Sequence, residues 1–249
     1  MKRAVLALIF PLLLLGAWQL AASGSLLSPA YFPAPSRTFE ALYQSIISGS
    51  LWSPLSATAV RMLEGWVLAS LLGILLGSFI GSSRLGREFL QPSLEFLRPF
   101  PASAIIPAAI MLLGLSNQMA IFVIAFGSVW PVLLGTLHGF SAIEPRLKEV
   151  ASTLEMRPIH YLFKMAIPSA LPDIFTGIRI SLAIALILAV VVEMQAAQPG
   201  LGQNILLAQR MFRSPELYAG IIVLGVFGLF ANRSLNVIEM YFLNWKDQR

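Results

Sequence analysis

The sequence predicts an all-α, polytopic membrane protein with about six transmembrane helices in a single domain, residues 1–249. Hydrophobic residues make up 57% of the 249-residue chain and charged residues only 12%, which is about half the charged fraction of a soluble domain. The apolar residues are gathered in runs of about 20, the length that an α-helix needs to cross the hydrocarbon core. Between two of these runs lies a charged stretch with the periodicity of amphipathic helices.

Six apolar runs are the candidate spans. The third is the shortest, and Pro107 interrupts it, so neighbouring helices or cavity water must satisfy the backbone groups freed there. The sixth is expected to continue as a helix to Phe242. The runs cover residues 4–22, 59–80, 102–115, 119–137, 174–192 and 217–231.

The first run has an alternative interpretation as a secretory signal. Lys2 and Arg3 precede it, and Ala21-Ala22-Ser23 could be a cleavage site. The run is long for the hydrophobic part of a signal peptide, so we favour a retained anchor.

The lysine and arginine residues set the orientation, because cytoplasmic loops carry an excess of them. With the amino terminus inside, six spans return the carboxyl terminus to the cytoplasm as well. The net charge of +5 is then explained by the inside loops rather than by nucleic-acid binding. The inside segments hold Lys2, Arg3, Arg84, Arg87, Arg98, Arg146, Lys148, Arg157, Lys164, Lys246 and Arg249, against Arg37, Arg61, Arg210 and Arg213 outside.

Residues 33–52 predict a short helix that lies along the outer membrane surface. Pro33, Pro35 and Ser36 mark a turn and an N-cap, and Gly49 ends the segment. An anchor that closes the outer end of the bundle is favoured over a contact site for a partner protein. The apolar face of this helix consists of Phe39, Leu42, Tyr43, Ile46 and Ile47.

Gly73, Gly77 and Gly81 recur every four residues along the second run. Small residues on one helical face let two backbones approach closely. Tight packing inside one subunit is favoured over a subunit interface or a sliding surface.

Residues 100–107, FPASAIIP, are unusual for a membrane span. A segment rich in proline and small residues forms irregular backbone at membrane depth. Such backbone is tolerated where it lines a cavity or is covered by protein. Ser103, Asn117 and Ser128 are the nearest polar groups that could face a cavity. The competing interpretations are a hydroxyl bonded to its own helix for each serine and a turn residue for Asn117.

Charged residues within the runs are few. Arg61 and Glu64 lie one turn apart and are expected to pair on one helix face. Arg179 either snorkels to the inner interface or offers its guanidinium to an anion, and snorkelling is favoured. Glu193 ends the fifth run and is expected to cap or anchor the outer gate region.

The charged stretch, residues 141–170, predicts two amphipathic helices separated by a turn. This helix-turn-helix unit is expected to be a docking surface on the cytoplasmic side. Pro158 separates the helices, and Pro168 and Pro172 are expected to close the unit before the next apolar run. The first helix carries the apolar face Leu147, Val150, Ala151 and Leu154, and the second carries Ile159, Leu162, Phe163 and Ala166.

This stretch resembles the "EAA loop" of permease subunits in binding-protein-dependent ABC importers. The pattern is present as Glu149-Val150-Ala151, with Glu155 at the position of the usual glycine and Met165-Ala166-Ile167-Pro168 at the end. Because φ > 0 is costly for Glu, the turn is expected to be more helical or to shift to residues 156–158.

The resemblance covers nearly the whole chain. It includes Leu97-Arg98-Pro99-Phe100-Pro101 before the third run, and Glu193 followed by Gly200-Leu201-Gly202 after the fifth. Among such permeases, the chain looks most like the nitrate, taurine and alkanesulfonate group.

The resemblance implies a permease in the bacterial inner membrane that forms a translocation path, with two copies on a two-fold axis. Two ATPase subunits would dock in the cytoplasm, and a solute-binding protein would deliver the cargo outside. The cargo would be a small solute such as nitrate, a sulfonate or bicarbonate, and no cofactor is expected. Coupling to the ATPase is assigned to Glu149, Val150, Ala151, Leu154, Glu155 and Arg157, and the path to Pro101, Ser103, Asn117, Ser128 and Arg179.

Two other function classes fit the sequence less well. A self-sufficient secondary transporter or channel would need coupling carboxylates within the spans or an internal repeat, and we find neither. A membrane enzyme would need clustered catalytic side chains, yet there are no cysteines and only two histidines, His138 and His160. The phosphate-binding motif G-x-x-x-x-G-K-[ST] is absent, so the chain is not itself an ATPase.

Overall fold

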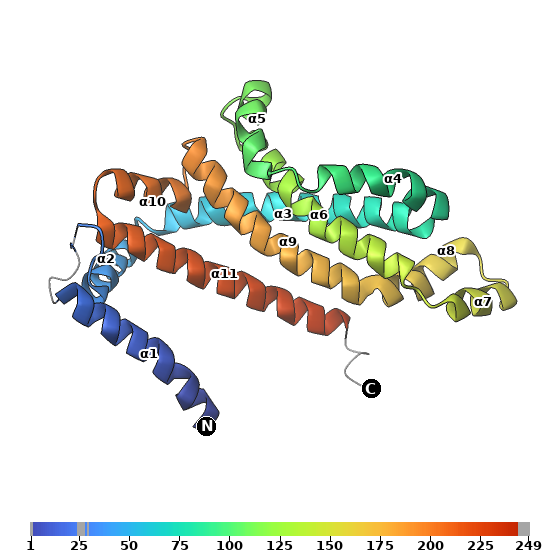
Figure 1. The fold of residues 1–249 in the computed structure, drawn as a ribbon, viewed down its shortest axis with the longest axis horizontal. Coiled ribbons are helices and arrows are strands. Elements are labelled where there is room, and N and C mark those ends of the chain that lie inside the picture. Colours follow the sequence, from blue (N-terminus) through green and yellow to red (C-terminus); the bar gives the residue numbers. More distant parts are fainter. Residues whose placement is uncertain (1, 24–27, 29, 244–249) are drawn as a thin grey trace.

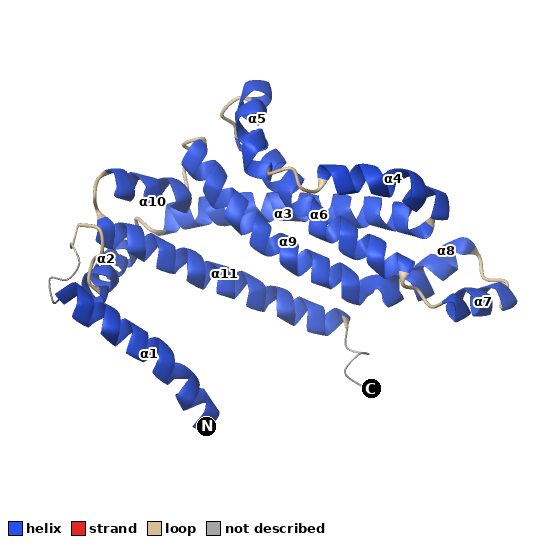
Figure 2. Cartoon of the chain, viewed as in Figure 1, coloured by secondary structure: helices blue, strands red, loops and turns tan. Residues whose placement is uncertain are grey.

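The computed structural model describes residues 2–23, 28 and 30–243, and these form helices and loops without a strand among them (Figure 2). The predicted all-α class is therefore confirmed. Some residues used for the orientation lie outside the described part of the structure. They are Lys246 and Arg249, together with the side chains of Lys2, Arg3, Arg84 and Arg87.

Four helices of the described chain are long and apolar enough to cross a membrane. They confirm the second, fourth, fifth and sixth predicted runs, and each helix extends beyond its run. The four are α3 (Trp52–Ser82), α6 (Asn117–Ser141), the continuous helix Pro158–Gln195 and α11 (Ser214–Phe242). The first run forms α1 (Lys2–Ser23), whose described apolar part, Ile9–Ser23, is shorter than these.

The third predicted span is wrong as a single helix, so six spans are not confirmed. Residues 102–115 form a 3₁₀ turn, η1 (Ala102–Ile105), and α5 (Ile106–Leu113). Eight residues of α-helix rise only about 12 Å, well short of the hydrocarbon thickness. The preceding helix, α4 (Arg84–Leu97), makes an angle of 78° with this segment, and the bent pair would be a fifth, broken span.

Helices α3 and α6 pack along the glycine face predicted from the sequence. A Cβ added to Gly73 would lie 2.7 Å from Cβ of Val132, and one added to Gly81 would lie 2.8 Å from Cβ of Phe140. Both helices advance by eight residues between these contacts, so they run parallel. The expected role of the glycines in packing within one subunit is confirmed. The chain must therefore return between α3 and α6 through α4, η1 and α5.

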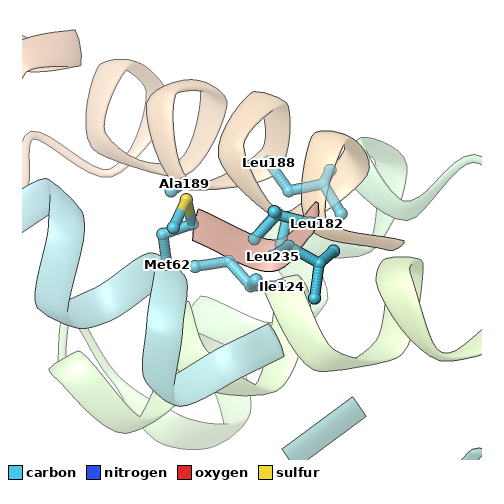
Figure 3. Close-up of a cluster of buried hydrophobic side chains, with 7 residues drawn as sticks. Met62, Ile124, Leu182, Leu188, Ala189 and Leu235 are labelled. Carbon is cyan, nitrogen blue, oxygen red and sulfur yellow. The ribbon is translucent and has the colours of Figure 1, made fainter. Parts of the chain in front are cut away.

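Helix α9 (Ile167–Gln195) packs antiparallel to α6, and the core lies where α3, α6, α9 and α11 meet. Figure 3 shows side chains of this core, which consists of Met62, Ile124, Leu182, Ala185, Leu188, Ala189 and Leu235. Helix α11 covers one side of the bundle with little of its surface buried, and α1 diverges from it (Figure 1).

The two ends of the bundle carry different elements (Figure 1). One end holds α2 (Pro35–Ile47) and α10 (Leu201–Arg210), and we call it the α10 end. The opposite end holds α7 (Pro145–Thr153) and α8 (Pro158–Tyr161), and we call it the α7 end. The helix expected near residues 33–52 is thus present as α2, and its apolar residues Phe39, Tyr43 and Ile47 are exposed.

Candidate functional site

The loop at the α7 end has the expected order of helix, turn and helix, but its second helix does not end where the prolines predicted. The segment Pro158–Gln195 is one continuous helix that contains both Pro168 and Pro172. Pro168 falls in the first turn of α9, directly after a π-helical turn, Leu162–Ala166. The wider π turn and the first-turn position accommodate a proline that lacks an N–H donor. The loop therefore continues directly into a membrane-spanning helix.

The turn after α7 is built on Glu155 itself, so both alternatives are wrong: the turn is neither more helical nor shifted to residues 156–158. Glu155 has φ 47, in the left-handed region. Its N–H donates to the carbonyl of Ser152 at 3.0 Å, and the N–H of Met156 donates to the carbonyl of Ala151 at 3.0 Å. These two bonds form the Schellman pattern that usually has glycine at this position. The backbone bonds outweigh the conformational cost of a non-glycine residue.

The single apolar face expected on α7 is divided between two environments. Ala151 is only 7% exposed, whereas Val150 is 46% and Leu154 is 64% exposed. Leu147 packs where α6 ends and α9 begins, against a cluster of Phe140, Ile143, Ala166, Ala170 and Ile174. The small size of Ala151 therefore serves packing within this chain, and Val150 and Leu154 are the apolar side chains available to a partner. The polar members of the predicted coupling set, Glu149, Glu155 and Arg157, are all exposed.

A groove of about 750 Å³ lies between the α4–η1 segment, α6 and α9. Apolar side chains form most of its walls, namely Phe100, Trp130, Leu134, Ile180, Ile184 and Leu188. Its polar groups are Arg98, Ser103, His138, Asp173 and Thr176. The indole N–H of Trp130 is buried and has no hydrogen-bond partner among the described residues. The groove thus offers an apolar wall and both signs of charge.

The predicted path residues lie in different places, and only Ser103 belongs to the lining of this groove. Pro101 is the extended residue directly before η1. Ser128 is buried, and its hydroxyl donates to the carbonyl of Ile124 at 2.5 Å, as the competing interpretation expected. The guanidinium of Arg179 pairs with the carboxylate of Glu239 on α11, a partner that the sequence analysis did not identify.

Asn117 and the charged residues of α3 belong to a polar cluster at the α10 end. The expected pair of Arg61 with Glu64 is wrong, because Nη1 of Arg61 bonds to Oε1 of Glu193 at 2.6 Å. Asn117 bridges the two α3 residues, since it accepts from Nε of Arg61 at 3.0 Å and donates to Glu64 at 3.2 Å. Glu193 is completely buried and also accepts from the hydroxyl of Thr58 at 3.0 Å. Glu193 therefore anchors this end, as expected.

One feature of the sequence points to this cluster. A carboxylate at the end of a span is followed closely by the glycines of Gly200-Leu201-Gly202. A Cβ at Gly200 would collide with the carboxylate of Glu193, and one at Gly202 would lie 2.5 Å from the carbonyl of Val190. The glycines let the start of α10 approach the buried carboxylate.

Comparisons with known proteins agree over most of the chain. Residues 69–243 match the family model described as "Binding-protein-dependent transport system inner membrane component". The chain is 31% identical over 240 residues to the putative aliphatic sulfonates transport permease protein SsuC of Bacillus subtilis, covering 96% of this chain and 87% of that protein. It is 29% identical to the nitrate import permease protein NrtB of Synechocystis, covering 91% of this chain and 84% of the relative.

A similar fold is found in a solved structure of the MetNI methionine ABC transporter in an inward-facing conformation. The TM-score is 0.61 at 18% sequence identity, and the match covers 77% of this chain and 93% of the other. At this identity the likeness concerns the fold alone.

Proposed function

Because the chain belongs to the family of binding-protein-dependent transport system inner membrane components, the permease subunits of ABC importers, we propose that two copies of it form the path of a small solute through the membrane. The chain is a multi-pass inner-membrane component of a transporter rather than an enzyme, and a separate subunit hydrolyses ATP. It works with an ATPase and a binding protein. That two copies assemble, and which solute they carry, is what we propose.

The observation that carries the proposal is the direct packing of the exposed loop onto the helices that line the groove. Leu147 of α7 packs against a buried cluster that includes Phe140 of α6 and Ala170 of α9. The same two helices provide Trp130 and Ile184 to the groove wall. A partner that moves α7 therefore moves the two walls of the groove, which is what coupling of ATP hydrolysis to transport requires.

A second copy of the chain fits the open side of the groove. Next to the groove, α5 projects from the bundle (Figure 1), with Met111 88% and Leu112 84% exposed. One subunit provides only one side of a path, and a two-fold partner would supply the other side and cover these side chains. The orientation follows from the basic residues, with the α7 end in the cytoplasm.

For the cargo we propose a small anion such as a sulfonate, nitrate or bicarbonate. Two relatives carry names that refer to aliphatic sulfonates and nitrate, both of which are anions. The groove of this chain is lined by Arg98, whose guanidinium can donate to anionic oxygens. Its apolar wall of Phe100 and Leu134 suits a cargo with a hydrocarbon part.

The docking role of α7 is tested by replacing Leu154 with Asp. Leu154 is exposed on the free chain, so the variant should fold and insert normally. A charge buried unpaired in a partner's groove costs several kcal/mol, so ATPase co-purification and transport in proteoliposomes should both fall sharply. A large residue at Ala151 is a poorer probe, because it would first overfill the packing of this chain.

The matched control is Ser152→Asp, which adds the same charge on the exposed polar side of α7. This control should assemble and transport close to the parent level. If the Leu154 variant assembled and transported like the parent, the docking role of α7 would be refuted.

A further inference from the structure

The polar cluster at the α10 end lies outside the groove lining and at the opposite end of the bundle from the loop that meets the ATPase, and neither proposed role uses it. We propose that Glu193, held by Arg61 and Thr58, is a positioning group that locks α10 and the adjacent ends of α3, α6 and α9 into one rigid unit. Movement of α7 then shifts the groove walls and opens the path, because the α10 end of the spans is not displaced. The inference rests on the proposed function as a transporter subunit.

The buried carboxylate of Glu193 joins three elements directly. Its Oε1 accepts from Arg61 of α3 at 2.6 Å, and its Oε2 accepts from Thr58 of α3 at 3.0 Å and from the N–H of Gly202 in α10 at 2.9 Å. Glu193 itself belongs to α9. A buried carboxylate is stable only when such bonds replace its hydration, so the bonds are expected to be made together or lost together.

The partners of Glu193 extend the lock to the neighbouring segments. Arg61 donates to the carbonyl of Pro199 at 3.3 Å and to Asn117, the first residue of α6, at 3.0 Å. The hydroxyl of Thr58 accepts from the N–H of Leu201, the first residue of α10, at 2.9 Å. The carboxylate thus lies at the N-terminus of α10, where the helix dipole favours a negative charge.

The α7 end of α9 is built in the opposite way. The ion pair between Arg179 and Glu239 is partly exposed, in contrast to the buried pair of Arg61 and Glu193. The helix there also contains a π-helical turn, Leu162–Ala166, and Pro172, both of which weaken its regular hydrogen bonding. At the α10 end α9 is held by buried polar bonds, whereas at the α7 end it packs on α6 through small residues such as Gly139 and Ala170. It can therefore act as a lever that is fixed at the α10 end.

The first test compares Thr58→Val with Thr58→Ser in the complete complex with its ATPase and binding protein. Valine keeps the shape of threonine but removes the hydroxyl that bonds to both Leu201 and Glu193, whereas serine keeps the hydroxyl. The readout is the number of cargo molecules transported per ATP hydrolysed in proteoliposomes. We expect this ratio to fall at least about tenfold in the valine variant, because both bonds of the hydroxyl are lost and the loss of a buried hydrogen bond to a charged group alone is worth about that factor. The ratio should stay near the parent value in the serine variant.

The second test compares Glu193→Gln with Glu40→Gln, which makes the same change at an exposed carboxylate on α2. The Glu193 variant should keep ATP hydrolysis but lose most transport per ATP, and the Glu40 variant should behave like the parent. An unchanged ratio in both Thr58→Val and Glu193→Gln overturns the proposal. So does failure of both variants to assemble, since the cluster would then be needed only for folding. A parent complex that hydrolyses ATP without transport would instead contradict the proposed function.

Discussion

Among the described residues, three other than glycine follow helices in the left-handed conformation: Glu155, Ala197 and Phe212, with φ of 47, 49 and 56. Phe212 repeats the pattern of Glu155, because the N–H of Arg213 donates to the carbonyl of Ala208 at 2.9 Å. An L-residue in this conformation costs about 1–2 kcal/mol. The turns at Glu155 and Phe212 are therefore held by their backbone bonds against the preference of their own side chains.

Replacing Glu155 with glycine should relieve this cost and stabilise the end of α7 by about 1 kcal/mol. Hydrogen exchange of the amides at residues 154–156 should become slower in the purified chain. Thr153→Gly is the control, because Thr153 is the last helical residue of α7 and glycine there should speed the exchange. Faster exchange in the Glu155 variant would contradict the assigned strain.

At this scale the sequence identified which residues were unusual but not always their partners. Glu155 was recognised as a departure, and the wrong prediction came from giving its φ cost more weight than two backbone hydrogen bonds. Arg61 was paired with Glu64, the neighbour one turn away, because local spacing is visible in a sequence. The true partner, Glu193, is 132 residues away, and no local pattern reports such a contact.

At the scale of elements, the packing of α3 on α6 depends on residues without side chains. A Cβ at Gly77 would lie 2.6 Å from Cβ of Thr136 and 2.7 Å from the carbonyl oxygen of Leu133. The second of these contacts is with backbone, which cannot move without shifting α6. The glycine positions thus fix how closely the two helices approach.

Gly77→Ala should lower the melting temperature of the purified chain. Alanine usually stabilises a helix by about 1 kcal/mol relative to glycine, but overpacking here costs about 1–3 kcal/mol. The matched control is Gly225→Ala on α11, where an added Cβ meets nothing within 4 Å. The control should leave the melting temperature unchanged or raise it. A Gly77 variant as stable as the control would contradict the close approach.

The elements that the sequence predicted well are those with long apolar runs, such as α3 and α6. The segment 102–115 was predicted poorly, because a short run interrupted by proline does not show how the chain returns. Its partner α4 is amphipathic rather than uniformly apolar, so no long apolar run in the sequence marks this helix. Likewise, Pro168 and Pro172 were read as helix ends, since the π turn that accommodates Pro168 has no sequence signature.

At the scale of the whole molecule, the orientation in the membrane remains a prediction from the basic residues. The structure places α7 and the end of α2 at opposite ends of the bundle (Figure 1). Ser152 on α7 and Ser48 after α2 are both exposed. The two positions therefore report on opposite sides of the membrane.

The chain has no cysteine, so single cysteines give an unambiguous label. In intact cells, Ser48→Cys should react with a membrane-impermeant maleimide, and Ser152→Cys should react only after the membrane is permeabilised. The positive-inside bias predicts this result. The reverse pattern would show that the orientation is inverted, and labelling of both positions in intact cells would place them on one side.

The parallel arrangement of α3 and α6 has a consequence for how the protein is made. Neighbouring spans that emerge from the ribosome one after another can pair as antiparallel hairpins, but α3 has to wait for a helix that begins 35 residues after it ends. Until α6 arrives, the glycine face of α3 has only lipid as a neighbour. Membrane insertion therefore includes a stage in which the glycine face of α3 is not covered by another helix. This stage ends only when the chain has returned through α4 and α5 and α6 has formed.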